Sequence, residues 1–398
     1  MIRAIKSFAC LLFAGLVFLQ TLYVFAATLP RIASVPVSNS KNIHAVRVLV
    51  AGNERLLGVT TKGAYRLWAL PSGQLLKKGG ALQGAMLAPT EKGIRLDKEE
   101  WAVRGVRIQP REDGDLIVGH THFRGTMDVL KNNENVLYAI NRLNVEDYLY
   151  GVLHYEVASW WPMAALKVQA IAARTYALYQ ASVSRGVEYD LKSSTSSQVY
   201  GGSTTEKFRT RRAVDLTSGE VLAYRGKIFP AYFHATCAGV TAGANELWKI
   251  DLPPLAGGVH CGYCKFSPHY YWKARVPLPQ IEERMVKYGH PVGQILKIEI
   301  ITKTPSARVG SLRITGTAGD FVMAAKDFRV WIGGDRIRST LFEISLREDI
   351  AEFNGRGWGH GVGLCQWGAL GQALLGRDYQ KILKFYYPGA DIISYESK

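Results

Sequence analysis

The run WPMAALKVQAIAARTYALYQ, residues 161–180, does most to indicate the fold class. Pro162 suits a first helical turn, where its missing N–H costs no hydrogen bond. Small and apolar residues then recur on one helical stripe, with Lys167 and Arg174 on other faces. The stripe consists of Leu166, Ala170, Ala173 and Ala177. This spacing predicts a long helix from Met163 to Gln180.

The residues before this helix follow another pattern. Short apolar or alternating runs, separated by turn residues, predict strands. They lie at 45–50, 104–108, 115–118, 125–129 and 136–140. After the long helix we expect strands at 220–224, 229–234, 298–301 and 312–315, and helices at 205–216, 366–375 and 379–386. Because helices and strands do not alternate regularly, the pattern favours an α+β fold over a doubly wound sheet.

The N-terminus predicts export. Arg3 and Lys6 precede an apolar run over residues 8–25, and Ala26 follows a small or branched pair, which suits cleavage by a signal peptidase. The alternative is an uncleaved membrane anchor, since the run approaches the ~20 residues that span a bilayer. We expect a signal peptide at 1–26, a strand-rich region at 27–122 and one larger domain at 123–398. The mature protein would then lie in the periplasm or cell envelope, at the membrane only if the signal stays uncleaved.

The chain is strongly basic, with 49 Lys and Arg against 33 Asp and Glu and a formal net charge of +16. Loss of the signal removes Arg3 and Lys6 and leaves +14. Such a balance suits a polyanionic partner. Export and the lack of a recognition motif argue against nucleic acid, which leaves an acidic glycan or anionic lipid. The plainer alternative is that the charge only aids solubility.

Glu156 is the candidate acid. It ends a largely apolar stretch and has Tyr155, Trp160 and Trp161 close by in sequence. Aromatic cover removes water from a carboxyl group and raises its pKa, as a general acid at neutral pH requires. The alternative is an ordinary solvated loop carboxylate.

A glycine-rich segment, GRGWGHGVGLCQWG at residues 355–368, is the candidate binding element. Its glycine density is incompatible with a helix interior and lets the backbone approach something bulky. Trp358, His360, Gln366 and Trp367 add stacking faces and hydrogen-bonding groups that suit a sugar. The alternative is a structural turn packed under two core tryptophans.

Four cysteines remain after Cys10 leaves with the signal. His234 and Cys237, with the C-x-x-C pair Cys261 and Cys264, could hold a structural zinc ion. A disulfide is the alternative, because an oxidising compartment favours it. Both interpretations stay open at this point.

Taken together, these segments resemble the SpoIID/LytB family, named for stage II sporulation protein D. The resemblance covers about residues 123–389. The matching segments are 146–152, Glu156, 161–162, 165–177, 197–202, 218–222, 355–369 and 386–389.

The resemblance implies a peptidoglycan lytic transglycosylase acting on glycan strands stripped of their stem peptides. Such an enzyme cleaves the β-1,4 bond from MurNAc to GlcNAc and leaves 1,6-anhydro-MurNAc ends, without a required cofactor. The family's catalytic glutamate matches Glu156. The substrate-binding candidates are Arg174, Gln198, Tyr200, Trp358, His360, Gln366 and Trp367. Arg174 could anchor a carboxylate by a bidentate pair, and the alternative is a solvated helix residue. Some members are regarded instead as non-catalytic enhancers of a cell-wall amidase, which is the alternative function.

The sequence departs from the family pattern in one region. Members with zinc near the catalytic site carry Cys and His between the long helix and the Gln-x-Tyr motif, whereas residues 189–197 hold neither here. That zinc site is therefore absent. Val157 replaces the usual methionine after the glutamate, and Cys365 stands where serine is common.

Overall fold

A computed structural model describes residues 35–36, 45–111, 115–184, 186–194 and 197–395. The predicted signal peptide lies outside these residues. No helix within these described ranges is both long and apolar enough to cross a membrane.

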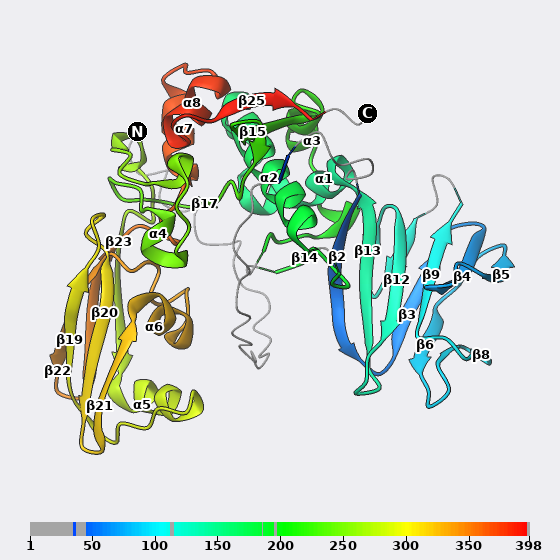
Figure 1. The fold of residues 1–398 in the computed structure, drawn as a ribbon, viewed down its shortest axis with the longest axis horizontal. Helices are drawn as coiled ribbons and strands as arrows, with labels where there is room; N and C mark the ends of the chain where they lie inside the picture. The colour runs from blue at the N-terminus through cyan, green and yellow to red at the C-terminus, as the bar shows by residue number, and fades with distance from the viewer. Residues whose placement is uncertain (1–34, 37–44, 112–114, 185, 195–196, 396–398) are drawn as a thin grey trace, which may run out of the picture. The chain divides into compact units, whose positions relative to one another are not determined.

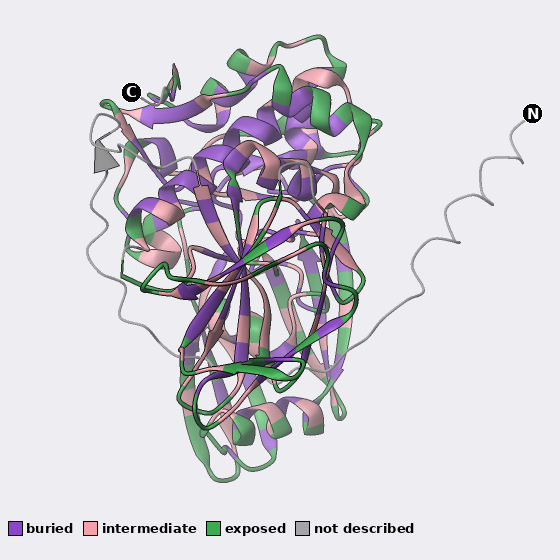
Figure 2. Cartoon of the chain, turned by 90° about the vertical axis from the view of Figure 1, so that its right-hand side faces the viewer, coloured by how far each residue is buried: buried purple, intermediate pink, exposed green. Residues whose placement is uncertain are grey.

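The strands of the described residues form six sheets. The largest has the order β14 (Leu191–Lys192), β2 (Ala45–Glu54), β13 (Leu137–Asn144), β12 (Thr126–Lys131), β9 (Gly105–Pro110), β4 (Tyr65–Leu70) and β5 (Leu75–Gly79). It is antiparallel except for β14, which pairs parallel with β2 (Figure 1). A second sheet has the order β11 (Thr121–Phe123), β10 (Leu116–Val118), β3 (Leu57–Thr61), β6 (Ala85–Pro89), β7 (Ile94–Leu96) and β8 (Glu99–Trp101). Strands such as β3 and β4 alternate buried and more exposed residues, as antiparallel strands over a core do. Figure 2 colours the chain by burial and shows buried residues interspersed with more exposed ones along the strands.

The other sheets are small. One has the order β1 (Val35–Pro36), β16 (Lys227–Ile228), β15 (Glu220–Tyr224) and β25 (Asp391–Ser394), and β17 (Phe233–His234) pairs parallel with β24 (Leu364–Cys365). Two three-stranded sheets comprise β18 (Tyr271–Pro277), β23 (Ile350–Arg356) and β22 (Phe342–Arg347), and β19 (Ile295–Lys303), β20 (Val309–Gly316) and β21 (Gly319–Ala324).

The helices are α1 (Val145–Glu156), α2 (Met163–Val183), α3 (Phe208–Asp215), α4 (Ala244–Trp248), α5 (Leu278–Lys287), α6 (Ala325–Ile332), α7 (Gln366–Leu374) and α8 (Tyr379–Tyr386). Short 3-10 helices lie at Gly202–Thr205, Pro253–Leu255 and Gly262–Cys264. This mixture confirms the predicted α+β class.

Helix α2 lies between two hydrophobic cores. Ala170, Ala173 and Ala177 pack into the core of the two large sheets and α1. Leu166 and Ile171 pack into a second core with α7 and α8. The helix is therefore buried on nearly every side, and its small alanine side chains let neighbours approach closely.

A third core is separate in sequence and lies wholly within residues 272–353. It joins the two three-stranded sheets to α5 and α6 (Figure 1). The chain then returns through the glycine-rich segment to α7. This excursion brings α6 to the cavity described below, although the two are far apart in sequence.

Most predicted elements are confirmed, α2 and the strands before it above all. One prediction needs correction, because residues 229–234 are extended in a sheet only at Phe233–His234. Residues 145–156 form helix α1, where no helix or strand was predicted. Strands of one sheet lie on both sides of the predicted domain boundary at residue 123. Strand β12 pairs with β9 and strand β13 pairs with β2, although β9 and β2 precede this boundary.

Candidate functional site

Glu156 is the last residue of α1, and it lines a cavity of about 550 Å³. Helix α1 begins at Asn144, whose side chain accepts a hydrogen bond from the N–H of Glu146 at 2.8 Å. Such a cap satisfies a free donor of the first turn. At the other end, extended Val157 stops the helix. The carboxyl group is thus held at a defined helix terminus.

Burial determines the charge state of Glu156. Loss of hydration raises the pKa of its carboxyl group from 4.5 to about 7. The Gln366 amide donates to Oε2 at 3.4 Å, and the Val199 N–H also donates to this carboxyl group; both bonds favour the ionised form and lower the pKa in part. Near neutral pH the group is therefore divided between acid and carboxylate. This is the behaviour expected of a residue that gives and takes a proton.

Aromatic side chains form much of the cavity wall. They are Tyr155, Tyr176, Tyr232, Phe233 and Trp248. Tyr155 is 49% exposed at the edge, and the rings of Tyr232 and Trp248 lie 4.4 Å apart. Flat apolar faces beside hydrogen-bonding groups are the usual lining of a site for a small organic ligand.

Two histidines of the cavity are neutral. Val362 connects them: its N–H donates to Nδ1 of His360 at 3.0 Å, and its carbonyl oxygen accepts from Nδ1 of His234 at 3.1 Å. Burial lowers the pKa of His234 to about 3 and that of His360 well below its ordinary value. Nε2 of His234 is buried without a hydrogen-bond partner among the described residues. Neither imidazole therefore supplies a positive charge at neutral pH.

The glycine-rich segment is folded against the protein itself. Four of its glycines have positive φ: Gly357, Gly359, Gly361 and Gly363. A Cβ on Gly361 would lie 2.5 Å from the Arg308 guanidinium, and one on Gly363 would lie 2.1 Å from the Tyr232 carbonyl oxygen. Glycine is required because these contacts leave no room for a side chain. The bulky neighbour expected from the sequence is, at these positions, the chain's own backbone and Arg308.

The structure brings three predicted residues of the catalytic and binding set into one cavity: Glu156, His360 and Gln366. Trp358 and Trp367 are partly buried beside it but are not part of its lining. Trp358 packs against His269 with ring centres 4.5 Å apart, and Trp367 packs against Trp161 at 5.6 Å. Their role here is to support the glycine-rich segment.

The other three predicted binding residues lie in the protein interior. Arg174 is 1% exposed and forms a bidentate ion pair with Glu146, at 2.8 and 2.6 Å. Gln198 accepts a hydrogen bond from the hydroxyl of Tyr148, and Tyr200 donates to Asn141. Each of the three side chains is thus bonded to another residue of the protein interior, and none of them lines the cavity.

Sequence reasoning missed the contribution of α6. Three residues of α6 line the same cavity: Lys326, Asp327 and Arg329. They lie about 170 positions after Glu156 in the sequence. Asp327 pairs with Lys326 at 3.1 Å, and Arg329 donates to the carbonyl oxygen of Arg338 at 3.2 Å. No local pattern signals this approach, since it depends on how the third core packs.

The cysteines differ from the predicted metal set. The structure brings Cys237, Cys261 and Cys264 together and adds Cys365 as the fourth member. His234 is not part of this group, because its ring turns to Val362 and the cavity. The cysteines are buried and not joined by a disulfide.

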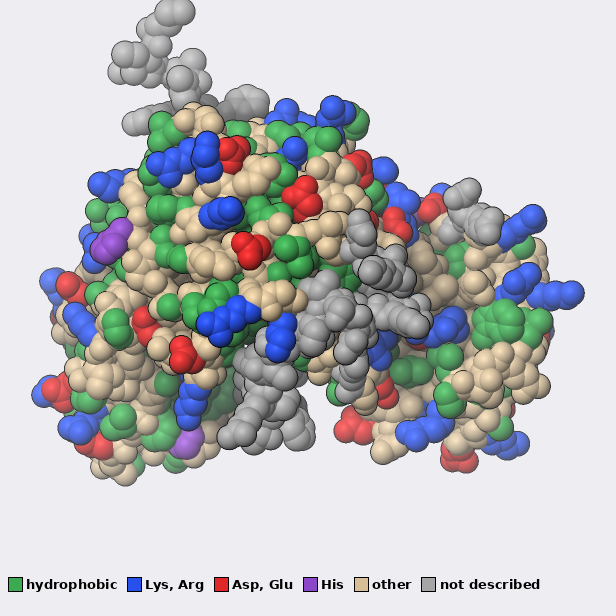
Figure 3. Space-filling model, turned by 45° about the horizontal axis from the view of Figure 1, so that its top comes forward, with side chains coloured by type: hydrophobic (Ala, Val, Ile, Leu, Met, Phe, Trp, Pro, Cys, Tyr) green, Lys and Arg blue, Asp and Glu red, His purple; other side chains and the backbone are tan. Residues whose placement is uncertain are grey.

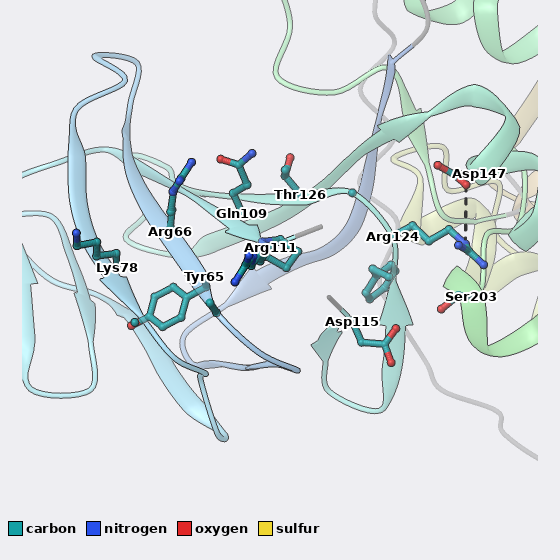
Figure 4. A pocket seen from close by; sticks show the side chains of 15 residues that line it. Tyr65, Arg66, Lys78, Gln109, Arg111, Asp115, Arg124, Thr126, Asp147 and Ser203 are labelled. Carbon is teal, nitrogen blue, oxygen red and sulfur yellow. Dashed lines mark ion pairs between the residues drawn. The ribbon is translucent and has the colours of Figure 1, made fainter. Parts of the chain in front are cut away.

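A larger cavity, of about 1220 Å³, lies at the two large sheets and includes none of the predicted site residues. Arg66, Lys78, Arg111 and Arg124 are among its lining residues (Figure 4). Its carboxylates have cationic neighbours, such as Arg124 at 3.9 Å from Asp147. Burial raises the pKa of Asp147 while Arg124 lowers it in part, whereas the pKa of Glu156 rises to about 7; the smaller cavity is therefore the better catalytic candidate.

The basic side chains are spread over the face of the molecule that Figure 3 shows. On the face in Figure 3, Lys and Arg side chains are distributed among Asp and Glu side chains and do not gather in one patch. The electrostatic attraction of a polyanion to this face would therefore be diffuse.

Comparisons with known proteins agree with this arrangement. Residues 133–224 match the family described as stage II sporulation protein, and residues 263–363 match the domain of unknown function DUF8618. The second match contains the whole third core.

Relatives match over longer stretches. An uncharacterised protein of Brachyspira hyodysenteriae is 30% identical over 357 residues, which cover 89% of this chain and 94% of that protein. Stage II sporulation protein D of Bacillus amyloliquefaciens is 29% identical, over 65% of this chain and 77% of its own. The amidase enhancer of Bacillus subtilis is 27% identical, over 62% of this chain; the match spans only 40% of that longer protein.

These matches place the chain among proteins named for stage II of sporulation or for enhancement of an amidase. The chain belongs to the SpoIID family, named for stage II sporulation protein D. The resemblance predicted from the sequence motifs is thereby confirmed.

Proposed function

We propose that the protein is an exported peptidoglycan lytic transglycosylase, with Glu156 as its general acid and base. It cleaves the β-1,4 bond between MurNAc and GlcNAc in glycan strands that have lost their stem peptides. The observation that carries this proposal is a carboxyl group with a pKa of about 7, held in a cavity rich in aromatic side chains. Its place of action is the periplasm or cell envelope.

One carboxyl group suffices for this reaction. Protonated Glu156 gives its proton to the glycosidic oxygen as the bond from C1 of MurNAc breaks, and GlcNAc leaves with a free 4-hydroxyl group. The C6 hydroxyl of the same MurNAc then attacks C1 and returns its proton to Glu156. The products carry a 1,6-anhydro ring, no water is consumed, and the enzyme regains its starting state. General acid–base catalysis of this kind contributes ~10²–10⁴-fold to the rate.

The cavity supports recognition of the substrate. Tyr155 and Tyr232 offer ring faces to sugars, while Lys326 and Arg329 bring positive charge to the same cavity. Each stripped MurNAc exposes a lactyl carboxylate, so the strand is a polyanion that these groups attract. The remaining basic charge adds long-range attraction that salt would weaken.

Asp327 creates the main chemical alternative. A glycoside hydrolase uses two carboxyl groups, one as acid and one to activate water or attack the sugar. Asp327 lines the same cavity as Glu156. Its ion pair with Lys326 and its position on a separate helix favour a role in binding. The product separates the two reactions, because hydrolysis leaves an ordinary reducing end.

A second candidate function rests on the relative named amidase enhancer. In this case the cavity binds glycan without turnover, and the protein raises the activity of a cell-wall amidase. Glu156 would then be a binding group only.

Digestion of peptide-free glycan by the mature protein tests the proposal. Mass spectrometry should detect 1,6-anhydro ends, and Glu156→Gln should reduce their formation by at least about 10²-fold. Glu283→Gln, at an exposed position of α5, is the matched control and should retain activity. If wild-type protein binds the glycan without cleaving it and stimulates an amidase, the enhancer function holds and the proposed one fails.

A further inference from the structure

We propose that Cys237, Cys261, Cys264 and Cys365 bind one zinc ion through four thiolates, as a structural site next to the cavity. The ligands come from three separate segments: the residues after β17, the 3-10 helix at Gly262–Cys264 with its N-cap Cys261, and the junction of β24 with α7. This site is independent of the proposed reaction.

The geometry fits a tetrahedral metal site. The four Sγ atoms all lie within 4.8 Å of one another, and Sγ of Cys237 is 3.6 Å from Sγ of Cys264. Zinc–sulfur bonds of about 2.3 Å place the sulfurs of a tetrahedron about 3.8 Å apart. A disulfide would require a separation of about 2.05 Å. Four protein ligands leave no open position for water, which is typical of a structural site.

Hydrogen-bond donors surround the sulfurs as they surround metal-bound thiolates. The N–H groups of Cys237 and Gly368 both donate to Sγ of Cys365 at 3.3 Å. The Tyr386 hydroxyl lies 3.0 Å from Sγ of Cys261. Cys365 is also the N-cap of α7, where the helix dipole stabilises negative charge. Such outer contacts orient the ligands of a metal site and stabilise their charge.

Buried Arg308 provides an independent observation. It is 2% exposed, and it donates through Nη2 to the carbonyl oxygen of Cys237 at 3.0 Å. Its Nε and Nη1 have no hydrogen-bond partner among the described residues, and no ion pair within 4 Å is found for it there. The Glu246 carboxylate acts on this charge but forms no ion pair with it, and a buried cation without a paired charge is costly. Zn²⁺ with four thiolates carries a net charge of −2, which would compensate the guanidinium.

The position of the site gives it a structural task. Cys237 follows β17 and Cys365 ends β24, so the ion would tie together two parallel strands. His234 ends the first strand and Gln366 directly follows the second, and both residues line the cavity. Gly368 is required there, because a Cβ would lie 2.6 Å from Sγ of Cys261. A bound metal would thus add a cross-link within the second core, to which Leu364 and all four cysteines belong.

Elemental analysis of the purified full chain tests the site. We expect one zinc per chain, and release of zinc by a chelator should expose four titratable thiols beyond Cys10 and lower the thermal unfolding temperature. Cobalt(II) in place of zinc should give the thiolate charge-transfer band and the visible spectrum of a tetrahedral four-sulfur site. The cobalt measurement uses folded wild-type protein and so does not depend on a variant that folds.

Two variants distinguish this four-cysteine ligand set from the set predicted from the sequence, which has His234 in place of Cys365. Cys365→Ser should lose zinc, or lose about a quarter of the charge-transfer intensity with cobalt if the metal is retained. His234→Ala should keep the full zinc content. A metal-free wild type whose mass is four hydrogens below that of the reduced chain would show two disulfides and overturn the proposal. Iron in place of zinc, or zinc loss only in His234→Ala, would also overturn it.

Discussion

Replacement of Glu156 by Gln should stabilise the folded protein, and only at higher pH. Gln keeps the shape and an oxygen that accepts from Gln366 and Val199, but it cannot ionise. The pKa of Glu156 rises from 4.5 to about 7 on folding because burial disfavours the charge. The contribution of the protonated group to the free energy of unfolding is fully present below pH 4.5 and is lost as the pH rises through 7.

The size of the effect follows from the two pKa values. At 1.36 kcal/mol per pKa unit, the rise from 4.5 to about 7 corresponds to about 3 kcal/mol at most. Glu156 keeps partial contact with solvent, which screens its charge, so we expect about 1–3 kcal/mol. We compare the free energy of unfolding of the variant with that of wild type at each pH. The difference in favour of the variant should be larger at pH 8.5 than at pH 4.5, by this amount.

Denaturant unfolding of both proteins at the two pH values measures this change. Glu283→Gln is the matched control and should show no comparable change, because its side chain is exposed on α5. If the free energies of unfolding of Glu156→Gln and wild type differ by the same amount at both pH values, the reasoning is refuted. The pKa of the Glu156 carboxyl group would then not be raised by burial.

The other predictions concern activity. The rate of glycan cleavage should fall about tenfold per pH unit above pH 7, with no matching loss from a second carboxyl group at lower pH; a bell-shaped profile would indicate two catalytic acids. Asp327→Asn should keep at least about a tenth of the turnover and mainly weaken glycan binding, whereas a loss of about 10²-fold or more in turnover would assign it a catalytic role. Gln366→Leu should move the upper limb of the pH profile upward by about half a pKa unit, because the bond that favours ionised Glu156 is lost; an unchanged profile would exclude this positioning role.

The long helix could be predicted from sequence because its signal is local. Pro162 and the Ala-rich stripe suffice to indicate α2. Helix α1 was missed, since its tyrosines, valines and Gly151 suit a strand as well as a helix. The Asn144 cap with acidic residues in the first turn was the signal that could have indicated it.

The candidate site was predictable only in part. Glu156 and Gln366 come from recognisable motifs, and the structure joins them by a hydrogen bond. Arg174 was assigned to the substrate because its partner, Glu146, lies 28 positions away and periodicity does not reveal such a pairing. Asp327 and Cys365 likewise take their places through tertiary packing. The positions of these residues depend on contacts between distant segments.

Digestion of peptide-free glycan in oxygen-18 water tests the central claim most directly. If Glu156 promotes attack by the C6 hydroxyl, new MurNAc ends are 1,6-anhydro rings that carry no oxygen-18, and Glu156→Gln forms none above background. New reducing ends labelled with oxygen-18 would show hydrolysis, and equal 1,6-anhydro product from Glu156→Gln would remove Glu156 from the reaction.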